Sequence, residues 1–551
     1  MFIGMNEKTD KNLDEDCQSP QGPIDCLKVS RATELGGRDR KIYRILEILP
    51  GAFSLITIIV LAILSYFKPV WVAYFIIAFD VYWLLLVIYM AIFLITSYRR
   101  LKKGLRTDWL KKCEDLQVAE IRQKEAASDS LSASGLKWQD VRQLIILPTY
   151  KESTEIIREC LMGLVNDGFP VENMIVALTI EERGGIEEAK KRAEDIKAEF
   201  GSKFGRFLVT LHPDGLLGEM KVKGANQAWA AKIVEKEIIL PEKINQDRLL
   251  VSVFDIDTVV IPGYFFALTY KFLTVSDPYH ASYQPVPVYH NNIWDAPFFS
   301  RIVASSNTFW QMIMQIRQES LVTYSSHSMT WRALSEIGFW STTNVSEDAR
   351  IFWHCLMHYN GHYRVEPLHF EVSMDVTTDQ GILKTAGNLY KQQRRWAWGG
   401  ENIPYLLFNA AKRWNNKGFD RGAIAGHIFI QIYGFHAWAT NALIIAVIGW
   451  LPMLLGGDRF NSTVLSGNLP AITQTLMNIA MIGLVLSAVI SSLLLPKRPK
   501  KYKFWKKVFM TLEWIFVPFS IVIFGAIPCL ESQIRLMLGK YMGFWVTPKV
   551  R

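Results

Sequence analysis

The sequence has little charge and few cysteines for its length. Only 21% of its 551 residues are charged, while half are hydrophobic and 13% are aromatic. This composition excludes a disordered chain and an ordinary soluble protein. The cysteines lack the paired spacing of a zinc module or a disulfide scaffold, and such thiols suit a reducing compartment. They are Cys17, Cys26, Cys113, Cys160, Cys355 and Cys529.

The net charge is +9, and the cations gather beside long apolar runs. This placement predicts that they lie at a membrane surface and do not bind nucleic acid. No basic-then-apolar signal peptide opens the chain, so we expect a polar N-terminal tail. Residues 48–67 and 70–97 each reach the roughly 20 residues that cross a bilayer. Lys68-Pro69 joins them, and Asp80 alone interrupts the second run. The pattern predicts a hairpin of two transmembrane helices.

Basic clusters flank this hairpin on both sides, which places both of its ends on the cytoplasmic face. Three more apolar runs, 425–455, 471–495 and 508–530, follow residue 400. Cations precede the first of these runs and separate the second from the third, so we expect the central region to be cytoplasmic too. The cluster after the hairpin consists of Arg99, Arg100, Lys102, Lys103, Arg106, Lys111 and Lys112.

Between residues 137 and 400, short β-rich runs alternate with helical stretches. This alternation predicts an α/β domain with a mainly parallel sheet, inserted between the transmembrane helices. Several strands end in polar residues, and ligands bind at the carboxyl ends of such strands. The strand candidates are 141–149, 174–180, 206–212 and 249–255.

Asp255 and Asp257 follow an apolar strand and share one face of it. Two hard oxygen ligands on one face suit Mg²⁺ or Mn²⁺ carrying a diphosphate. The alternative is a solvated strand end. Glu347 and Asp348 open a predicted helix, where Asp348 is a candidate general base or a helix-start acid that interacts with the macrodipole.

A third motif, Gln-x-x-Arg-Trp, occupies residues 392–396. Arginine forms planar, bidentate contacts with phosphate, and tryptophan offers a large flat face. The alternative is a basic amphipathic helix lying at the membrane. The helical pattern continues into 397–412, which favours that alternative in part.

Taken in order, these motifs resemble the membrane-embedded family 2 glycosyltransferases, which include cellulose, chitin and hyaluronan synthases. The order is Pro-Thr-Tyr-Lys-Glu at 148–152, Asp-x-Asp at 255–257, Glu-Asp at 347–348 and Gln-x-x-Arg-Trp at 392–396. In addition, residues 544–549 (Phe-Trp-Val-Thr-Pro-Lys) resemble the gating loop of cellulose synthase-type enzymes.

The resemblance implies a GT-A-like nucleotide-sugar-binding domain and an inverting, metal-dependent hexosyl transfer. Asp348 would be the catalytic base, and Asp257 would bind Mg²⁺ or Mn²⁺. A UDP-sugar is the favoured donor, although Glu181 and Glu182 stand where the family usually has an Asp that binds the base. The residues that would hold the nucleotide-sugar are Thr149, Tyr150, Glu152, Glu182, Lys223, Asp255, Gln392, Arg395, Trp396, Thr547 and Lys549.

The family resemblance and the apolar runs together divide the chain into seven segments. These are a polar tail at 1–45, a transmembrane hairpin at 46–98, a basic juxtamembrane helix and linker at 99–136, a cytosolic glycosyltransferase domain at 137–400, interfacial helices at 401–424, a transmembrane bundle at 425–530 and a gating-like segment at 531–551. A gating segment must be cytoplasmic, so we expect 508–530, which contains Pro518 and Pro528, to be broken, re-entrant or interfacial.

The expected activity is sugar transfer to a growing polysaccharide in the inner or plasma membrane. One alternative is a non-processive enzyme that moves one sugar onto a lipid or lipid-linked acceptor. A second is a transporter or scaffold with an inactive domain, which the presence of every motif carboxylate disfavours. The implied partners are the nucleotide-sugar, a glycan or lipid-linked acceptor and membrane lipid. Assembly into an oligomer is one way for so few spans to enclose a channel.

Overall fold

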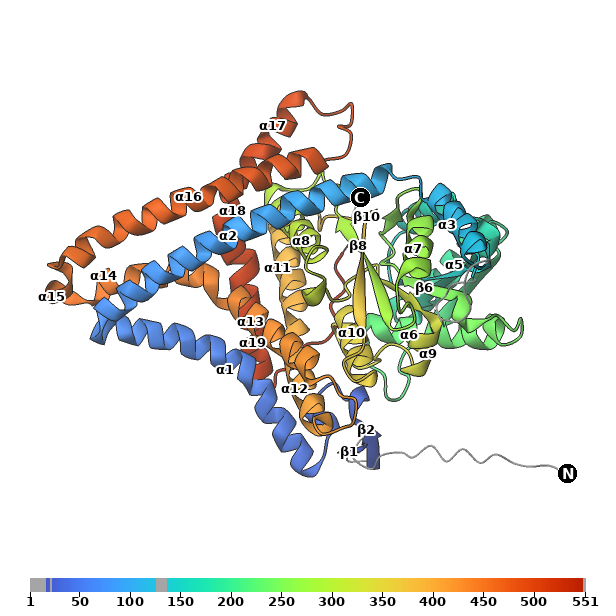
Figure 1. Ribbon diagram of the computed structural model, residues 1–551, viewed down its shortest axis with the longest axis horizontal. Helices are drawn as coiled ribbons and strands as arrows, with labels where there is room; N and C mark the ends of the chain where they lie inside the picture. The colour runs from blue at the N-terminus through green and yellow to red at the C-terminus, as the bar shows by residue number, and fades with distance from the viewer. Residues whose placement is uncertain (1–15, 20–21, 125–135, 549–551) are drawn as a thin grey trace.

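The computed structural model describes residues 16–19, 22–124 and 136–548. An α/β domain occupies one side of the molecule, and long apolar helices project from it to the other side (Figure 1). Lys549, residues 125–135 of the expected juxtamembrane helix and linker, and residues 1–15 and 20–21 of the expected N-terminal tail lie outside the described residues.

The α/β domain is built on one eight-stranded sheet of order β5-β4-β3-β6-β9-β8-β10-β7. Its first four members in this order are parallel, β8 and β10 are also parallel, and only β9 and β7 run antiparallel to their neighbours. The strands are β3 (Arg142–Thr149), β4 (Met174–Glu181), β5 (Arg206–His212), β6 (Leu249–Val253), β7 (Val259–Val260), β8 (Ala281–Val288), β9 (Ser328–Thr330) and β10 (Arg364–Ser373).

The four strands predicted from sequence are confirmed, with ends that differ by at most two residues. Strands β3, β4 and β6 are apolar on both faces because helices cover the sheet on both sides. Along β3, for example, Ile146 joins one apolar core cluster while Ile145 and Leu147 join the other. The predicted α/β domain with a mainly parallel sheet is therefore confirmed.

Helices connect the strands and cover both faces of the sheet. They are α4 (Thr154–Val165), α5 (Ile186–Phe200), α6 (Lys223–Val234), α7 (Tyr264–Thr274), α8 (Phe298–Met314), α9 (Trp331–Glu336) and α10 (Glu347–His358). Two helices that follow β10 lie between the sheet and the apolar helices (Figure 1), namely α11 (Ile382–Ala397) and α12 (Asn402–Arg413). A further helix, α3 (Trp109–Lys124), packs against α7.

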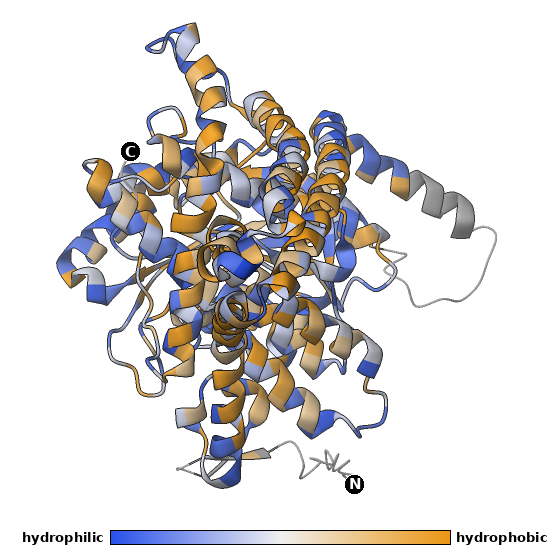
Figure 2. Ribbon diagram, turned by 90° about the vertical axis from the view of Figure 1, so that its left-hand side faces the viewer, coloured by the Kyte–Doolittle hydropathy of each residue, from blue (hydrophilic) through white to orange (hydrophobic). Residues whose placement is uncertain are grey.

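Among the described residues, five helical segments are long and apolar enough to cross a membrane. Four of them project from the α/β domain, and orange apolar residues cover them in Figure 2. The pair α2 and α16 is packed so closely that a Cβ on Gly483 would lie 2.4 Å from the Val87 side chain. The four helices are α1 (Gly37–Phe67), α2 (Pro69–Arg106), α13 (Arg421–Ala446) and α16 (Val464–Leu494), and the short α14 (Leu451–Leu455) and α15 (Gly457–Asn461) join the last two.

The fifth segment, Phe504–Met537, runs across the base of the other four instead of alongside them (Figure 1). It is interrupted by a 3₁₀ turn at Glu513–Phe516 and a π turn at Val522–Ala526. Its helices are α17 (Phe504–Leu512), α18 (Val517–Ile521) and α19 (Ile527–Met537), and α19 packs against both α1 and α11. The C-terminal segment, residues 540–548, therefore lies on the same side as the α/β domain.

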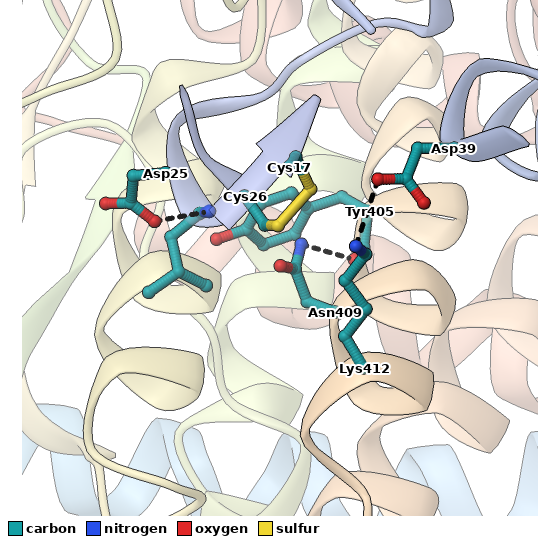
Figure 3. Close-up of a disulfide and its surroundings, with 8 residues drawn as sticks. Cys17, Asp25, Cys26, Asp39, Tyr405, Asn409 and Lys412 are labelled. Atoms are coloured by element: carbon teal, nitrogen blue, oxygen red, sulfur yellow. Dashed lines mark hydrogen bonds and ion pairs between the residues drawn. A yellow bond between two sulfur atoms is a disulfide. The ribbon is translucent and has the colours of Figure 1, made fainter. Parts of the chain in front are cut away.

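The expectation that no cysteines pair is wrong for two of the six. Cys17 and Cys26 form a disulfide that closes the hairpin of β1 (Asp16–Ser19) and β2 (Gly22–Asp25), shown in Figure 3. Both sulfur atoms are buried against α1 and α12, beside Tyr43 and Phe408. Sequence spacing misses this pair because a short hairpin brings together two cysteines that belong to no metal-binding or multi-disulfide pattern. The other four cysteines are free and buried.

Candidate functional site

The carboxyl ends of the central strands bring the sequence motifs to one edge of the sheet. Thr149 ends β3, Glu181 ends β4, Asp255 follows β6 and Asp375 follows β10. Parallel strands direct their carboxyl ends to the same edge, which is where ligands bind in such sheets. The polar side chains that the sequence scatters over more than 200 residues therefore share one region.

Lys223 is the central residue of this region. It is the first residue of α6, and its Nζ atom lies 2.9 Å from Asp255 Oδ1 and 2.8 Å from Asp348 Oδ2. A third ion pair joins it to Glu347 Oε1 at 2.9 Å. A Cβ on Gly224 would lie 2.4 Å from the carbonyl oxygen of Ser341, so only glycine permits this close approach of α6. One ammonium group thus holds three carboxylates from two motifs together.

Burial and charge set the protonation of this cluster. Burial alone would lower the pKa of Lys223, but the three carboxylates raise it well above its usual value, so the side chain is a cation. Glu347 is 2% exposed, and burial raises its pKa to about 7 despite the opposing charge of Lys223. Asp348 is more open, with 23% of its side chain exposed. Of the two acids, Asp348 is therefore the carboxylate that solvent and substrate reach.

Asp257 lies two residues after Asp255. It forms a second carboxylate pair with Asp375. The Asp375 backbone N–H donates to Asp257 Oδ2 at 3.2 Å. Asn291 Nδ2 donates both to the Asp257 carbonyl and to Asp375 Oδ1, each at 2.8 Å. Within the described part of the chain, no group of three or more His, Cys, Asp or Glu side chains is arranged to hold a metal. The donor set fits Mg²⁺ or Mn²⁺ held by one or two carboxylates and completed by substrate phosphates.

The loop before β9 supplies two polar residues that the sequence motifs do not include. Ser325 donates its hydroxyl to Asp255 Oδ2 at 2.7 Å. His327 is fully buried, and its Nδ1 lies 2.9 Å from the Tyr324 carbonyl, so this nitrogen carries the proton. Burial lowers the pKa of His327, and Asp348 and Lys223 are among the charges acting on it. The loop therefore fixes Asp255 and adds a neutral imidazole to the cluster.

The opposite end of the site surrounds Tyr150. The Arg183 guanidinium lies 4.7 Å from the centre of the Tyr150 ring, and Glu152 Oε2 accepts the Tyr150 N–H at 2.7 Å. Glu181 is buried and pairs with Arg183, whereas Glu182 is half-buried in the next turn. Of the two carboxylates after β4, Glu181 is the more buried, and the contact of Glu182 with the nucleotide-sugar stays a prediction. Burial raises the pKa of Glu181, and Arg183 opposes the rise.

The Gln-x-x-Arg-Trp motif lies in the last turns of α11. Its spacing of three and four residues puts Gln392, Arg395 and Trp396 on one helical face. Thr377 donates to Gln392 Oε1 at 2.8 Å, and Trp396 packs against an apolar cluster that contains Trp294. The Arg395 guanidinium also reduces the pKa rise of Glu347, so the motif borders the Lys223 cluster.

The C-terminal segment reaches this motif. The Phe544 ring lies 4.8 Å from the Arg395 guanidinium carbon, and Tyr541 donates to Glu47 Oε2 at 2.8 Å. Thr547 is 8% exposed. Within the described chain, its hydroxyl has no hydrogen-bond partner, and the same is true of Arg395 Nε and Thr149 Oγ1. Buried polar atoms of this kind normally have partners, so these three suit contacts with a polar ligand.

Some of the predicted site residues are in direct contact, whereas others are connected only through residues that lie between them. Lys223, Asp255 and Asp348 are in contact, while the Tyr150 end is linked to them by Arg183, which donates to the Lys221 carbonyl at 3.3 Å. Sequence analysis missed Arg183, Asn291 and Asp375. A signal existed for Arg183, which directly follows the Glu181-Glu182 pair after a strand. The others sit in loops without a motif.

The family model described as glycosyl transferase family group 2 matches residues 250–523. This supports a family 2 glycosyltransferase. The matched region begins in β6 and includes the carboxylate motifs, α11 and most of the apolar helices that follow. No curated protein matches the chain.

Solved structures resemble this chain only at a distance. The mannosyltransferase PcManGT from Pyrobaculum calidifontis, in complex with GDP-Man and Mn²⁺, is 13% identical with a TM-score of 0.40, and the match covers 76% of this chain and 98% of that one. TarS 1-349 from S. aureus in complex with UDP is 12% identical with a TM-score of 0.32, covering 64% and 91%. At this distance, the chemistry of the present chain has to be argued from its own residues.

Proposed function

We propose that this chain is an inverting membrane glycosyltransferase that transfers a sugar from a nucleotide-sugar, with a UDP-sugar as the favoured donor, to a growing polysaccharide. The observation that carries the proposal is the Lys223 cluster. A single cation there connects Asp255, from the Asp-x-Asp motif, with Asp348, the candidate base, at the edge of the sheet where ligands bind. The family match to residues 250–523 supports the same reaction class.

In this mechanism, Asp348 accepts the proton of the acceptor hydroxyl while that oxygen attacks the anomeric carbon. The bond from this carbon to the diphosphate oxygen breaks, and the nucleoside diphosphate leaves with the electron pair. One displacement inverts the anomeric centre, and the leaving group needs no second carboxylate to protonate it. Asp348 sits in the first turn of α10, and its side chain is 23% exposed, so an acceptor hydroxyl can approach it.

The other polar residues bind and orient the donor. Arg395 and Gln392 would contact the diphosphate and the acceptor end from α11, with Trp396 offering a face for a sugar ring. Asp257, beside Asp375, would hold Mg²⁺ or Mn²⁺, which when bound neutralises charge on the leaving diphosphate. Lys223 adds a fixed positive charge at the same place.

The nucleotide would lie at the Tyr150 end of the site. Thr149, Tyr150 and Glu152 form one wall of it, and the interior Glu181 with Arg183 forms another. Glu182, half-buried in the turn after β4, would border the nucleotide beside them. Thr547 and the neighbouring Lys549 would close over the bound donor from the C-terminal side. The Phe544–Arg395 contact supports this placement because it brings the C-terminal segment to α11.

The α/β domain would face the cytoplasm from the inner or plasma membrane. Basic clusters at both ends of the α1–α2 hairpin support this orientation through the positive-inside rule. The fifth apolar segment would then lie at the membrane interface. Its crossing direction in Figure 1 and the contact of α19 with α11 favour this over a full span.

A second candidate function is transfer of one sugar to a lipid or lipid-linked acceptor. The membrane helices favour this function because they pack only loosely against the rest of the chain. Only 11–28% of each apolar window is buried within the chain, so most of these side chains face outward and one chain encloses little channel. A polymer path would then require assembly of several copies.

Sizing the product separates the two candidates. Membranes containing the protein would be incubated with labelled UDP-glucose, UDP-N-acetylglucosamine or GDP-mannose and with Mg²⁺ or Mn²⁺. The proposal expects a long polymer from one UDP-sugar, absent in the Asp348→Asn variant and after chelation of divalent metal. A single labelled sugar on an organic-extractable product would establish the second candidate instead. No labelled product with any donor, from protein that is folded and metal-loaded, would overturn both.

A further inference from the structure

Three cations form an exposed stripe on α2 just beyond its apolar run. Arg99, Lys103 and Arg106 are spaced by four and three residues, so they share one helical face, and all three are exposed. With Tyr98, Lys102 and Leu105 among the other lining residues, they border a groove of about 780 Å³. We call these three residues the basic stripe.

The charge of the basic stripe is not balanced by any ion pair among the described residues. Within the described chain, none of its three residues forms an ion pair with a carboxylate, whereas other surface cations such as Arg248 and Lys271 do. The neighbouring Lys102 is different, because it is half-buried and opposes the burial-induced rise in the pKa of Glu371. The stripe is therefore a concentration of uncompensated positive charge.

Packing fixes the direction in which the stripe points. Opposite it, Leu101 is fully buried, and a Cβ on Gly104 would lie only 2.3 Å from the His369 carbonyl oxygen on β10. Trp109 Nε1 donates to the Gly104 carbonyl at 2.8 Å and secures the end of the helix. Because α2 cannot rotate without breaking these contacts, the three cations stay on the outer face.

The same helical face is apolar about two to four turns before Arg99. Leu85, Ile88 and Ile92 are 61%, 48% and 59% exposed. Counted at 3.6 residues per turn, these positions align with Arg99 and Lys103. The outer face of α2 thus changes from apolar to basic along one line. This order is complementary to a phospholipid, whose acyl chains lie in the bilayer and whose phosphate lies at the surface.

We propose that this face of α2 binds an anionic membrane phospholipid, with an acyl chain along Leu85–Ile92 and the phosphate at the basic stripe. Charge complementarity carries the choice of partner, since arginine makes bidentate contacts with phosphate and each juxtamembrane cation adds attraction to an anionic leaflet. Because α2 is seated on β10, bound lipid would also anchor the α/β domain at the membrane surface. This proposal does not depend on the sugar or the acceptor.

The test compares lipid retention by the full chain and by the triple variant R99Q/K103Q/R106Q. Each protein would be reconstituted in vesicles of equal phosphatidylcholine and phosphatidylglycerol, extracted in mild detergent, and its retained lipid quantified by mass spectrometry. The wild-type chain is expected to retain phosphatidylglycerol in preference to phosphatidylcholine. In the triple variant, this preference is expected to fall at least about tenfold. The matched control removes three exposed lysines of the α/β domain, K191Q/K197Q/K236Q, and keeps the preference.

Three outcomes would overturn the proposal. The triple variant could retain phosphatidylglycerol as the wild type does, while its thermal midpoint shows that it is folded. The control variant could lose the preference equally, which would assign the effect to net charge. Inorganic phosphate at millimolar concentration could displace the lipid completely, which would make the stripe a site for free phosphate. Retention that survives phosphate and fails only in the triple variant supports the proposal.

Discussion

Lys223 donates to both carboxylate oxygens of Asp348, at 2.8 and 3.0 Å, from the first turn of α6. The contact joins two helices that start 124 residues apart, at Lys223 and Glu347. It fixes the position of the Asp348 carboxylate, which is 23% exposed. A carboxylate held in place and open to solvent is positioned to take a proton from an incoming hydroxyl.

Replacing Asp348 with Asn should therefore abolish turnover without abolishing donor binding. The amide keeps the size of the side chain but cannot accept the acceptor proton, so we expect kcat to fall by about 10²–10⁴-fold. The dissociation constant for UDP, measured by calorimetry, should stay within a few-fold. The matched control Asp247→Asn, at a half-exposed carboxylate outside the site, should change neither quantity. Sugar transfer at the wild-type rate by the Asp348 variant would remove this residue from the mechanism.

Replacing Asn291 with Ala should weaken metal binding, although Asn291 is not itself a proposed ligand. Its amide holds both the Asp257 backbone and the Asp375 carboxylate. Loss of such an outer partner typically costs 10–100-fold in metal affinity. The readout is Mn²⁺ binding in the presence of UDP, followed by electron paramagnetic resonance. Asp257→Asn should weaken it further, and an unchanged Mn²⁺ affinity in both variants would place the metal elsewhere.

Removing the Phe544 ring should loosen the C-terminal segment. The ring lies over Arg395, and a cation–π contact at a partly exposed site contributes roughly 0.5–1 kcal/mol. We expect Phe544→Ala to raise the donor KM about two- to fivefold and to leave the thermal midpoint nearly unchanged. Phe504→Ala, at an exposed aromatic residue of α17, serves as the control. A drop in kcat at constant KM would argue that the segment acts on chemistry and not on donor retention.

Reducing the Cys17–Cys26 disulfide should destabilise the N-terminal hairpin. The bond closes a loop with a sequence separation of 9, and the chain-entropy account gives about 2–3 kcal/mol for a loop of this size. Dithiothreitol and the double variant C17S/C26S should both speed protease cleavage near residue 26. The double variant should no longer respond to dithiothreitol. Equal cleavage of oxidised and reduced wild-type protein would show that packing against Tyr43 and Phe408 suffices.

Acid should destabilise the α/β domain through its buried histidines. Burial lowers the pKa of His290 and His369 to about 4 and that of His354 to about 3. These lie below the unfolded value near 6.5, so their stabilising effect is complete above pH 6.5 and is lost as pH falls below it. Each contributes at most about 1.4 kcal/mol per pH unit between its two pKa values. Thermal midpoints between pH 7 and 5 should fall, and His354→Gln should flatten the fall.

The strands and the motif order were readable from the sequence for local reasons. Strands β3, β4 and β6 are buried on both faces, so they appear as unbroken apolar runs that end at polar residues. Asp255 and Asp348 were identifiable because one follows such a strand and the other opens a helix. Such features depend only on residues that are adjacent in the sequence, so they can be recognised without the structure.

The partners of those residues were not readable. Asn291, Ser325 and Asp375 lie in loops whose composition resembles any polar turn, and only the sheet order β6-β9-β8-β10 brings these loops to Asp255 and Asp257. The choice of Glu181 over Glu182 as the interior carboxylate also depends on the turn after β4, which places one side chain inward and the next outward.

The apolar runs by themselves determined that this chain has segments able to cross a membrane, because length and hydropathy decide that property residue by residue. They did not determine the direction of Phe504–Met537, since a spanning helix and an interfacial one have similar composition. The tertiary structure shows what the segment packs against, because α19 contacts α1 and α11 and the chain beyond it brings Phe544 to Arg395. Sequence fixes which residues avoid water, whereas their arrangement depends on contacts between segments that lie hundreds of residues apart.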